Sequence, residues 1–196
     1  MPDYTKYQYG RIATLARKLD DAGVAPGIRD AIMAGGEAVR PSSSNAAKAA
    51  WMGGAMERMD SLMDREARCA IRESCACCLG GKRGEICKQI AKQHSSLEDR
   101  IAAANEAKYV FGQGVERLPD GRLRVRFFPE GQESYRCVCL RGADQPFSVT
   151  YCYCCGGHIR HHLQTALGRE LRLTTEATAL SSGGRESCTF LFEMIE

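Results

Sequence analysis

The sequence lacks any long hydrophobic run, because charged residues interrupt all of its apolar stretches. A membrane-spanning helix needs about 18 or more consecutive apolar residues, so no membrane span is predicted. A signal-peptide core and a small-residue cleavage site are also missing from the first residues, which read MPDYTKYQYGRIATLARKLDD. We therefore expect a cytoplasmic protein.

A strong excess of one charge is absent as well. The formal net charge is +3, from 27 Lys and Arg against 24 Asp and Glu. Nucleic-acid-binding proteins usually present a concentrated basic face, so no nucleic-acid partner is expected. Hydrophobic residues make up 44% and charged residues 26% of the 196 positions, which predicts a folded chain of one domain, or one domain with a helical extension.

Recognised catalytic motifs are missing too. The chain has no nucleophile elbow and no Ser/His/Asp arrangement, and Lys82-Arg83 follow two glycines without Walker-type spacing. The alternating Arg122, Arg124 and Arg126 are expected on a solvated strand face. No catalytic residue is assigned, and the sequence leaves open whether the protein is an enzyme.

The first part of the chain has helical periodicity. Apolar residues recur at three- and four-residue steps in segments 10–23, 26–33, 46–73 and 85–108, which predicts a helix for each. One stripe is rich in methionine and comprises Trp51, Met52, Ala55, Met56, Met59, Leu62 and Met63. Core packing is the favoured interpretation of this stripe, and a partner-binding or homodimer surface is the alternative.

The second part of the chain indicates strands. Residues 115–128 alternate and predict a half-buried strand that follows the turn Pro119-Asp-Gly121, and the other expected strands are 135–140, 147–153, 170–178 and 187–195. A helix over 156–167, closed by Gly168, separates them. We therefore predict an α+β fold, in which a helical region (1–111) packs on a mainly antiparallel sheet with one further helix (112–196) to form one compact unit.

Cysteine is abundant, with 11 residues, and this is the most informative feature. The number is odd and no export signal is seen, so reduced thiols are favoured over disulfides. Two groups stand out, and Cys188 lies apart from both. The first contains Cys69, Cys75, Cys77, Cys78 and Cys87, and the second contains Cys137, Cys139, Cys152, Cys154 and Cys155, followed by His158.

The spacing within the second group suggests convergence. Cys137-Val-Cys139 and Cys152-Tyr-Cys154 each place two sulfurs on one face if they lie on strands. Cys154 and Cys155 are expected at a helix N-terminus, where the helix dipole lowers a thiol pKa and favours the thiolate. Thiolates bind zinc or an iron–sulfur cluster as ligands, or attack an electrophilic substrate as nucleophiles.

Metal binding is the favoured interpretation of these clusters. The candidate ligands are Cys75, Cys77, Cys78, Cys152, Cys154, Cys155 and His158. Zinc is the expected metal and an iron–sulfur cluster the alternative. Reactive thiols, with Cys154 or Cys155 as nucleophile and His158 as base, form a second interpretation, and simple packing a third. Packing is expected for Cys69, Cys137 and Cys188.

The last quarter of the chain resembles a known family. Leu167-Gly168, the segment 171–176 and the segment 184–190, which ends in Cys188-Thr-Phe190, are similar to the tail of the 4-vinyl-reductase (predicted hydrocarbon-binding) domain family. The tail also resembles the related L-2-amino-thiazoline-4-carboxylic acid hydrolase-like proteins. This resemblance implies an α+β fold, a pocket for a small apolar or aromatic ligand, frequent dimers, and a pocket-facing Cys188.

Together, the residues and the resemblance predict a small-molecule-binding or sensor protein with a cysteine-rich zinc site. The alternative is a thiol-dependent hydrolase or an iron–sulfur redox protein.

Overall fold

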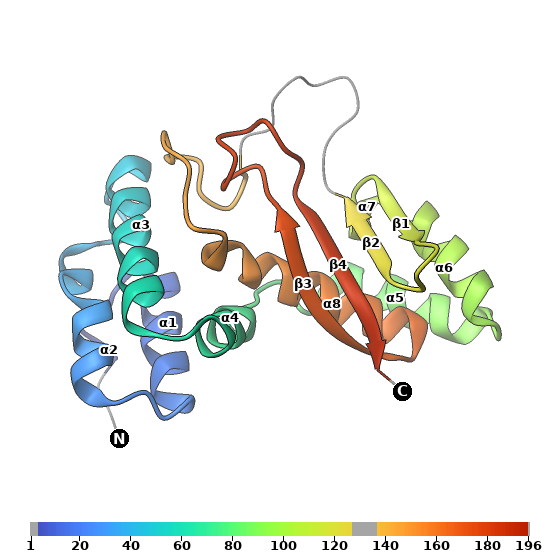
Figure 1. Cartoon of the computed structure of the whole chain (residues 1–196), viewed down its shortest axis with the longest axis horizontal. Coiled ribbons are helices and arrows are strands. Elements are labelled where there is room, and N and C mark those ends of the chain that lie inside the picture. The colour runs from blue at the N-terminus through green and yellow to red at the C-terminus, as the bar shows by residue number, and fades with distance from the viewer. Residues whose placement is uncertain (1–3, 127–136, 196) are drawn as a thin grey trace.

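The computed structural model describes residues 4–126 and 137–195, which form an α+β protein as predicted (Figure 1). The N-terminal elements are α1 (Gly10–Asp21), α2 (Pro26–Met33), η1 (Gly36–Ala38), α3 (Asn45–Leu62) and α4 (Arg65–Ser74). Next come α5 (Gly81–Gln93), α6 (Leu97–Glu106), α7 (Lys108–Phe111), β1 (Gly114–Arg117) and β2 (Leu123–Arg126). The last elements are η2 (Val149–Cys152), α8 (Tyr153–Leu167), β3 (Glu170–Ala177) and β4 (Thr189–Ile195).

Side-chain caps divide two of the expected helices. The Asp64 carboxylate accepts a hydrogen bond from the backbone N–H of Ala67, so α4 begins as a separate helix after α3. Ser96 caps α6 in the same way through the N–H of Asp99. The single helices predicted over 46–73 and 85–108 were therefore wrong, because a capping residue interrupts each apolar pattern.

The four strands form one antiparallel sheet in the order β1-β2-β4-β3. The β3–β4 pair confirms the strands predicted over 170–178 and 187–195. The β1–β2 hairpin confirms the turn at Pro119-Asp-Gly121, although residues 127 and 128 of that expected strand lie outside the described residues. Val115, Leu123 and Val125 point into the core, so the intervening residues of these strands face outward.

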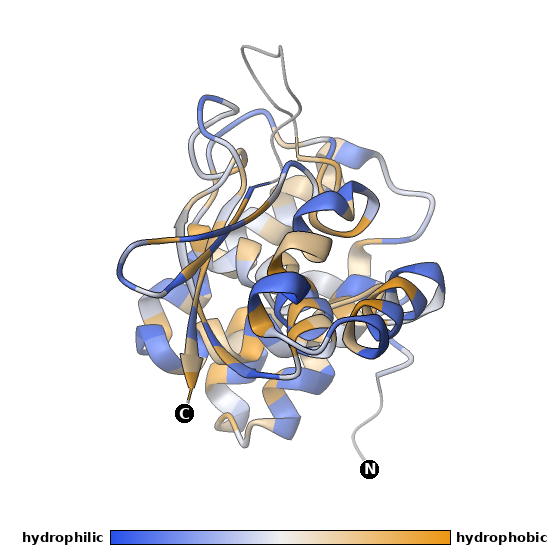
Figure 2. Cartoon of the chain, turned by 90° about the vertical axis from the view of Figure 1, so that its right-hand side faces the viewer, coloured by the Kyte–Doolittle hydropathy of each residue, from blue (hydrophilic) through white to orange (hydrophobic). Residues whose placement is uncertain are grey.

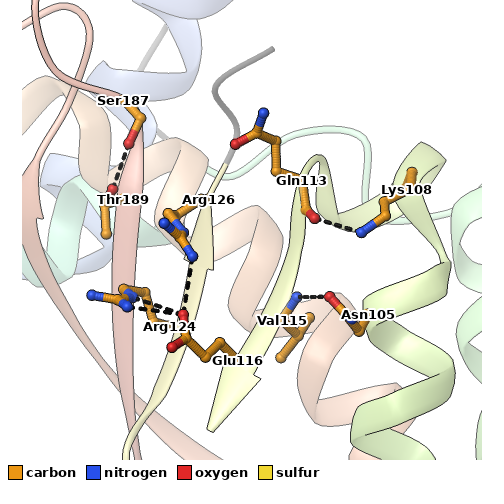
Figure 3. A network of polar contacts seen from close by, with 9 residues as sticks. All are labelled: Asn105, Lys108, Gln113, Val115, Glu116, Arg124, Arg126, Ser187 and Thr189. Carbon is orange, nitrogen blue, oxygen red and sulfur yellow. Dashed lines mark hydrogen bonds and ion pairs between the residues drawn. The ribbon is translucent and has the colours of Figure 1, made fainter. Parts of the chain in front are cut away.

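The outward face of the hairpin carries a small charged network (Figure 3). Glu116 Oε2 lies 2.8 Å from Arg124 Nη2 and 3.1 Å from Arg126 Nη2, and all three side chains are partly exposed. On the neighbouring strand edge, Asn105 of α6 accepts a hydrogen bond from Val115 N at 3.2 Å. These arginines therefore form the solvated strand face that their alternation predicts.

Helix α8 crosses the inner side of the sheet, and its first turns pack closely on two neighbours. A Cβ atom at Gly156 would lie 2.5 Å from Leu173 Cδ2 of β3. A Cβ atom at Gly157 would lie 2.5 Å from the backbone oxygen of Glu73, at the end of α4. The two glycines thus let α8 approach both β3 and α4. At its other end, Gly168 terminates α8 with a φ of +67°, which confirms the predicted stop.

The molecule has two hydrophobic clusters that meet along α4 and the η2–α8 junction. One cluster lies between the sheet, α8, α5 and α6, and the other lies among α1, α2 and α3. Met52, Ala55, Met56 and Met59 are almost completely buried in the second, which confirms core packing for these members of the methionine stripe, whereas Leu62 at its end is exposed. Figure 2 shows hydrophobic residues on the inner sides of the helices and hydrophilic residues on their outer sides.

Among the described residues, no helix combines the length and the apolar character that crossing a membrane requires.

Candidate functional site

A cavity of about 250 Å³ opens at the junction of the two clusters, and we name it the cysteine cavity. Among the described residues, its lining includes eight cysteines, namely Cys77, Cys78, Cys137, Cys139, Cys152, Cys154, Cys155 and Cys188. His158 lines it too, with Val138, Tyr151 and Phe190 as apolar and aromatic walls. All of these cysteines carry free thiols. Segments far apart in the sequence therefore bring their thiols to one place.

The route by which these cysteines converge differs from the predicted one. The segment expected as a strand over 147–153 forms η2 and the start of α8 instead. Ser148 Oγ accepts a hydrogen bond from Thr150 N, which starts a helical turn despite the alternating apolar pattern. Residues 137–140 form a turn, and residues 135 and 136 of that expected strand lie outside the described residues. Both C-x-C pairs therefore reach the cavity from turns and helices, so their placement on strands was wrong.

Three histidines of α8 hold the cysteine-rich loop that links α4 to α5. His158 Nδ1 lies 2.9 Å from the carbonyl oxygen of Cys77, His162 Nε2 lies 3.0 Å from that of Cys78, and His161 Nε2 lies 3.0 Å from that of Leu79. A ring N–H donates in each contact, since a carbonyl only accepts. We name this arrangement the histidine clamp.

The clamp fixes a strained backbone. Cys78 has a φ of +60°, a left-handed conformation that costs a non-glycine residue about 1–2 kcal/mol. His162 is completely buried and contacts the carbonyl of this same residue, while its Nδ1 has no hydrogen-bond partner among the described residues. The surrounding structure thus holds Cys78 in a conformation that presents its thiol to the cavity.

The clamp also sets the tautomer of His158. Because Nδ1 donates to the Cys77 carbonyl, the neutral ring keeps a lone pair on Nε2. Metal-binding histidines commonly donate their second ring N–H to a backbone carbonyl in this way. Burial lowers the pKa of His158 to about 4, and the neighbouring His162, Arg83 and His161 act in the same direction. The ring is therefore neutral near pH 7, as a metal ligand must be.

Burial keeps most of the cavity thiols protonated. It raises the pKa of Cys152 to about 12 and that of Cys155 well above the ordinary thiol value. It also raises the pKa of Cys154, although the Arg72 guanidinium opposes this shift. The lowered pKa predicted for Cys154 and Cys155 was therefore wrong. The η2 turn runs directly into α8 and its Thr150 carbonyl accepts the Tyr153 N–H, so the helix N-terminus is not fully open.

Cys137 differs from its neighbours. A hydrogen bond from the Cys139 thiol lowers the pKa of Cys137, and burial only partly opposes this. The same hydrogen bond, together with burial, raises the pKa of Cys139. Cys137 was assigned to packing, as was Cys188, yet both line the cavity. The C-x-C spacing indicates convergence for Cys137, whereas no spacing signal marks Cys188, and only the family resemblance implied that Cys188 faces a pocket.

The donor set suits a thiophilic metal by its chemistry. It consists of thiols and one neutral imidazole, and none of the described lining residues is a carboxylate. The Cys77 and Cys78 sulfurs lie 3.8 Å apart. Two thiolates on one tetrahedral zinc, with Zn–S bonds of about 2.3 Å, have a separation of about 3.8 Å. Within 4–126 and 137–195, however, no three His, Cys, Asp or Glu side chains are arranged around a common point for an ion. Metal binding thus requires further thiols to rotate toward this pair.

The remaining cysteines are placed differently. Cys75 lines a second, adjoining cavity of about 150 Å³, which shares Cys77, Cys139 and Cys154 with the cysteine cavity. Cys69 and Cys87 are buried in the hydrophobic cluster beneath the sheet, which confirms packing for Cys69. All seven predicted ligands therefore line one or the other of the two adjoining cavities.

The fold and the site define an α+β protein with a cysteine-lined cavity between a helical bundle and a helix-backed sheet. The chain belongs to the family of unknown function DUF6144, whose model matches residues 20–178. That range includes the histidine clamp and most of the cavity cysteines, but it ends before Cys188. No curated protein and no solved structure matches the chain. The resemblance to the 4-vinyl-reductase domain stays a prediction.

Proposed function

We propose that this protein is a small-molecule-binding or sensor module whose cysteine cavity binds zinc. One observation carries the proposal, namely the eight free thiols that line one cavity together with His158. A cavity that served only as a gap in the core would be lined by aliphatic side chains, since unlinked thiols in such number bring reactivity. Thiolate and imidazole are the ligands that zinc prefers.

The candidate ligands come from a loop and from two consecutive helical elements. Cys75, Cys77 and Cys78 belong to the loop between α4 and α5, and the others belong to η2 and α8. The remaining candidates are Cys152, Cys154, Cys155 and His158. Zinc shared between these elements would tie the loop to α8, and so would link the helical bundle to the sheet. The histidine clamp already brings the loop to α8, which reduces the rearrangement that binding requires.

The same geometry supports a sensing role. Because burial raises the pKa of the Cys77 thiol to about 11, the metal-free thiol is protonated at neutral pH. Zinc binding then releases protons and replaces a neutral cluster with a charged one. The loop also contains the strained Cys78, so we expect its backbone to change conformation between the two forms. Tyr151, Phe190 and Val138 leave an apolar wall for a small ligand.

The hydrolase alternative receives less support from the geometry. A cysteine nucleophile reacts as the thiolate, and the pKa values of Cys154 and Cys155 are raised. His158 would activate such a thiol as a base, but its lowered pKa makes it a weak one. We therefore assign no catalytic residue.

Metal analysis of the full chain, purified anaerobically without chelator, tests the proposal. We expect about one or two zinc ions per chain, the number that one or two structural sites hold, and no visible absorption. The double variant Cys77→Ser, Cys78→Ser should lose the zinc, while the core variant Cys69→Ala should keep it. Zinc retained equally by both variants would contradict the proposed ligands. Iron with visible absorption would instead favour the alternative, an iron–sulfur protein.

A further inference from the structure

The second cavity contains two arginines and no acidic side chain among its described lining residues. Arg11 comes from the first turn of α1 and Arg72 from α4. Thr14 and Tyr151 complete its polar lining. We name it the arginine cavity. Three of its lining residues, Cys75, Cys77 and Cys154, are also proposed zinc ligands, whereas its two arginines are not.

Arg72 is buried, and no acidic side chain of the described residues neutralises its charge. Only 4% of its surface is exposed, and its Nη2 donates to the carbonyl oxygen of Tyr151 at 3.3 Å. Its guanidinium carbon also lies 5.0 Å from the Tyr151 ring centroid. Within the part of the chain that the structure describes, its Nε has no hydrogen-bond partner and no carboxylate forms an ion pair with it. Buried arginines are normally paired, because the guanidinium stays charged.

Two further positive groups face the same cavity. Arg11 Nη1 donates to the Tyr151 hydroxyl at 3.2 Å and to the carbonyl oxygen of Cys139, and no described carboxylate pairs with it either. Gly10, the first residue of the 12-residue helix α1, also lines the cavity. The N-terminus of a helix carries partial positive charge and free N–H groups, which favour an anion.

We propose that the arginine cavity binds a small oxyanion, a carboxylate or phosphate group, between Arg11 and Arg72. The guanidinium forks suit the oxygens of such groups. The cavity adjoins the cysteine cavity through Cys139, Tyr151 and Cys154. The oxyanion is therefore either a free ion or the acid group of a molecule whose apolar part extends past these residues. The oxyanion site does not depend on the zinc proposal.

Four probes separate these sources in thermal unfolding and calorimetric titrations of the full chain. Inorganic phosphate and acetate represent free ions, hexanoate represents an acid with an apolar body, and hexanol is its uncharged control. We expect at least one anion to bind and hexanol to bind at least tenfold more weakly than hexanoate, if hexanoate is the ligand. Preference for hexanoate over acetate identifies an organic acid, and preference for phosphate or acetate identifies a free ion. No binding of any anion would overturn the proposal.

Variants test the site itself. Arg11→Gln should weaken binding of the preferred anion at least fivefold, whereas Arg17→Gln, an exposed residue on the same helix outside the cavity, should not change it. Arg72→Met should remove binding while unfolding no more easily than the anion-free wild type, because it removes an unpaired buried charge. Equal binding by the Arg11 and Arg17 variants would overturn the site. Titrations before and after chelator treatment keep this result independent of zinc.

Discussion

Arginine and cysteine have opposite settings in two regions of this molecule. On the sheet, Arg124 and Arg126 are partly exposed and paired with Glu116, and beneath it Cys87 of α5 is completely buried in an apolar cluster. At the junction with the helical bundle, Arg72 is buried without a carboxylate partner among the described residues, and the cysteines line open cavities. At the sheet, the charged arginines therefore lie near water and the cysteine lies in the core, as their chemistry favours. At the junction, the arginine is buried and the cysteines line cavities.

This difference supports placing the proposed function at the junction. Unpaired buried charge and clustered thiols do not stabilise a fold by themselves, so a ligand is the natural reason to keep them together. The junction also contains the strained Cys78 and the Nδ1 atom of His162, which has no hydrogen-bond partner within 4–126 and 137–195. The following predictions compare the two regions, from the largest expected effect to the smallest.

Separating α4 from α8 should disrupt the junction most. The change Gly157→Ala places a Cβ atom 2.5 Å from the Glu73 carbonyl oxygen, which is backbone and cannot rotate away. We expect the free energy of unfolding to fall by about 1–3 kcal/mol, the usual cost of overpacking. The matched control is Gly27→Ala on α2, where a Cβ atom meets open space. Urea unfolding measures both, and equal stability of the two variants would contradict the close contact.

Serine substitutions should separate packing cysteines from cavity cysteines. Cys87→Ser buries a hydroxyl in the apolar cluster, which should cost about 1–3 kcal/mol. Cys188→Ser lies at the cavity wall and should change stability by about 0.5 kcal/mol or less. Chemical denaturation of the metal-free chain gives both values. The comparison between the regions fails if the Cys188 variant is the less stable one.

Acid should loosen the histidine clamp. Burial lowers the pKa of His158 from 6.5 to about 4 and also lowers that of His162. Between these pKa values the unfolded chain binds more protons than the folded chain, so stability is complete above pH 6.5 and is lost as the pH falls toward 4. His158→Asn should flatten this dependence in denaturation curves of the metal-free chain measured at several pH values. If the stability of the variant depends on pH as steeply as that of the wild type, His158 is not the source of the pH dependence.

The charged network on the sheet should contribute least. Arg124 and Arg126 hold the pKa of Glu116 below its ordinary value, and all three groups are partly exposed. Glu116→Gln should therefore cost less than about 1 kcal/mol, and less still at high salt. Unfolding measurements at low and high salt check this. A larger loss of unfolding free energy that does not depend on salt would contradict the view of these residues as a solvated strand face.

Local patterns predicted most of the fold. The steps of apolar residues in α1, α2 and α8, the Pro119–Gly121 hairpin and the β3–β4 pair all follow from spacing and turn chemistry. The segment 147–153 failed because Ser148 starts a helical turn where the apolar alternation indicates a strand. The two divided helices failed because single capping residues, Asp64 and Ser96, outweighed continuous apolar patterns.

The candidate site was less predictable. The cysteine clusters were visible in the sequence, since their density is unusual in any setting. Packing was the expectation for Cys137 and Cys188 from residue type, only the resemblance implied a pocket-facing Cys188, and the burial of Arg72 was not predicted. Its burial arises only when η2 and α8 pack on that helix, which brings Tyr151 against it. Tertiary contacts of this kind leave no periodic trace in the sequence.

The most direct test of the zinc site is X-ray absorption spectroscopy at the zinc edge on the metal-loaded full chain. The account predicts at least three sulfur ligands at about 2.3 Å, the Zn–S distance of thiolate sites, and fewer in the variant Cys77→Ser, Cys78→Ser. A zinc environment of only nitrogen and oxygen ligands, or a sulfur number unchanged in that variant, would contradict the proposal that the cysteine cavity binds the metal.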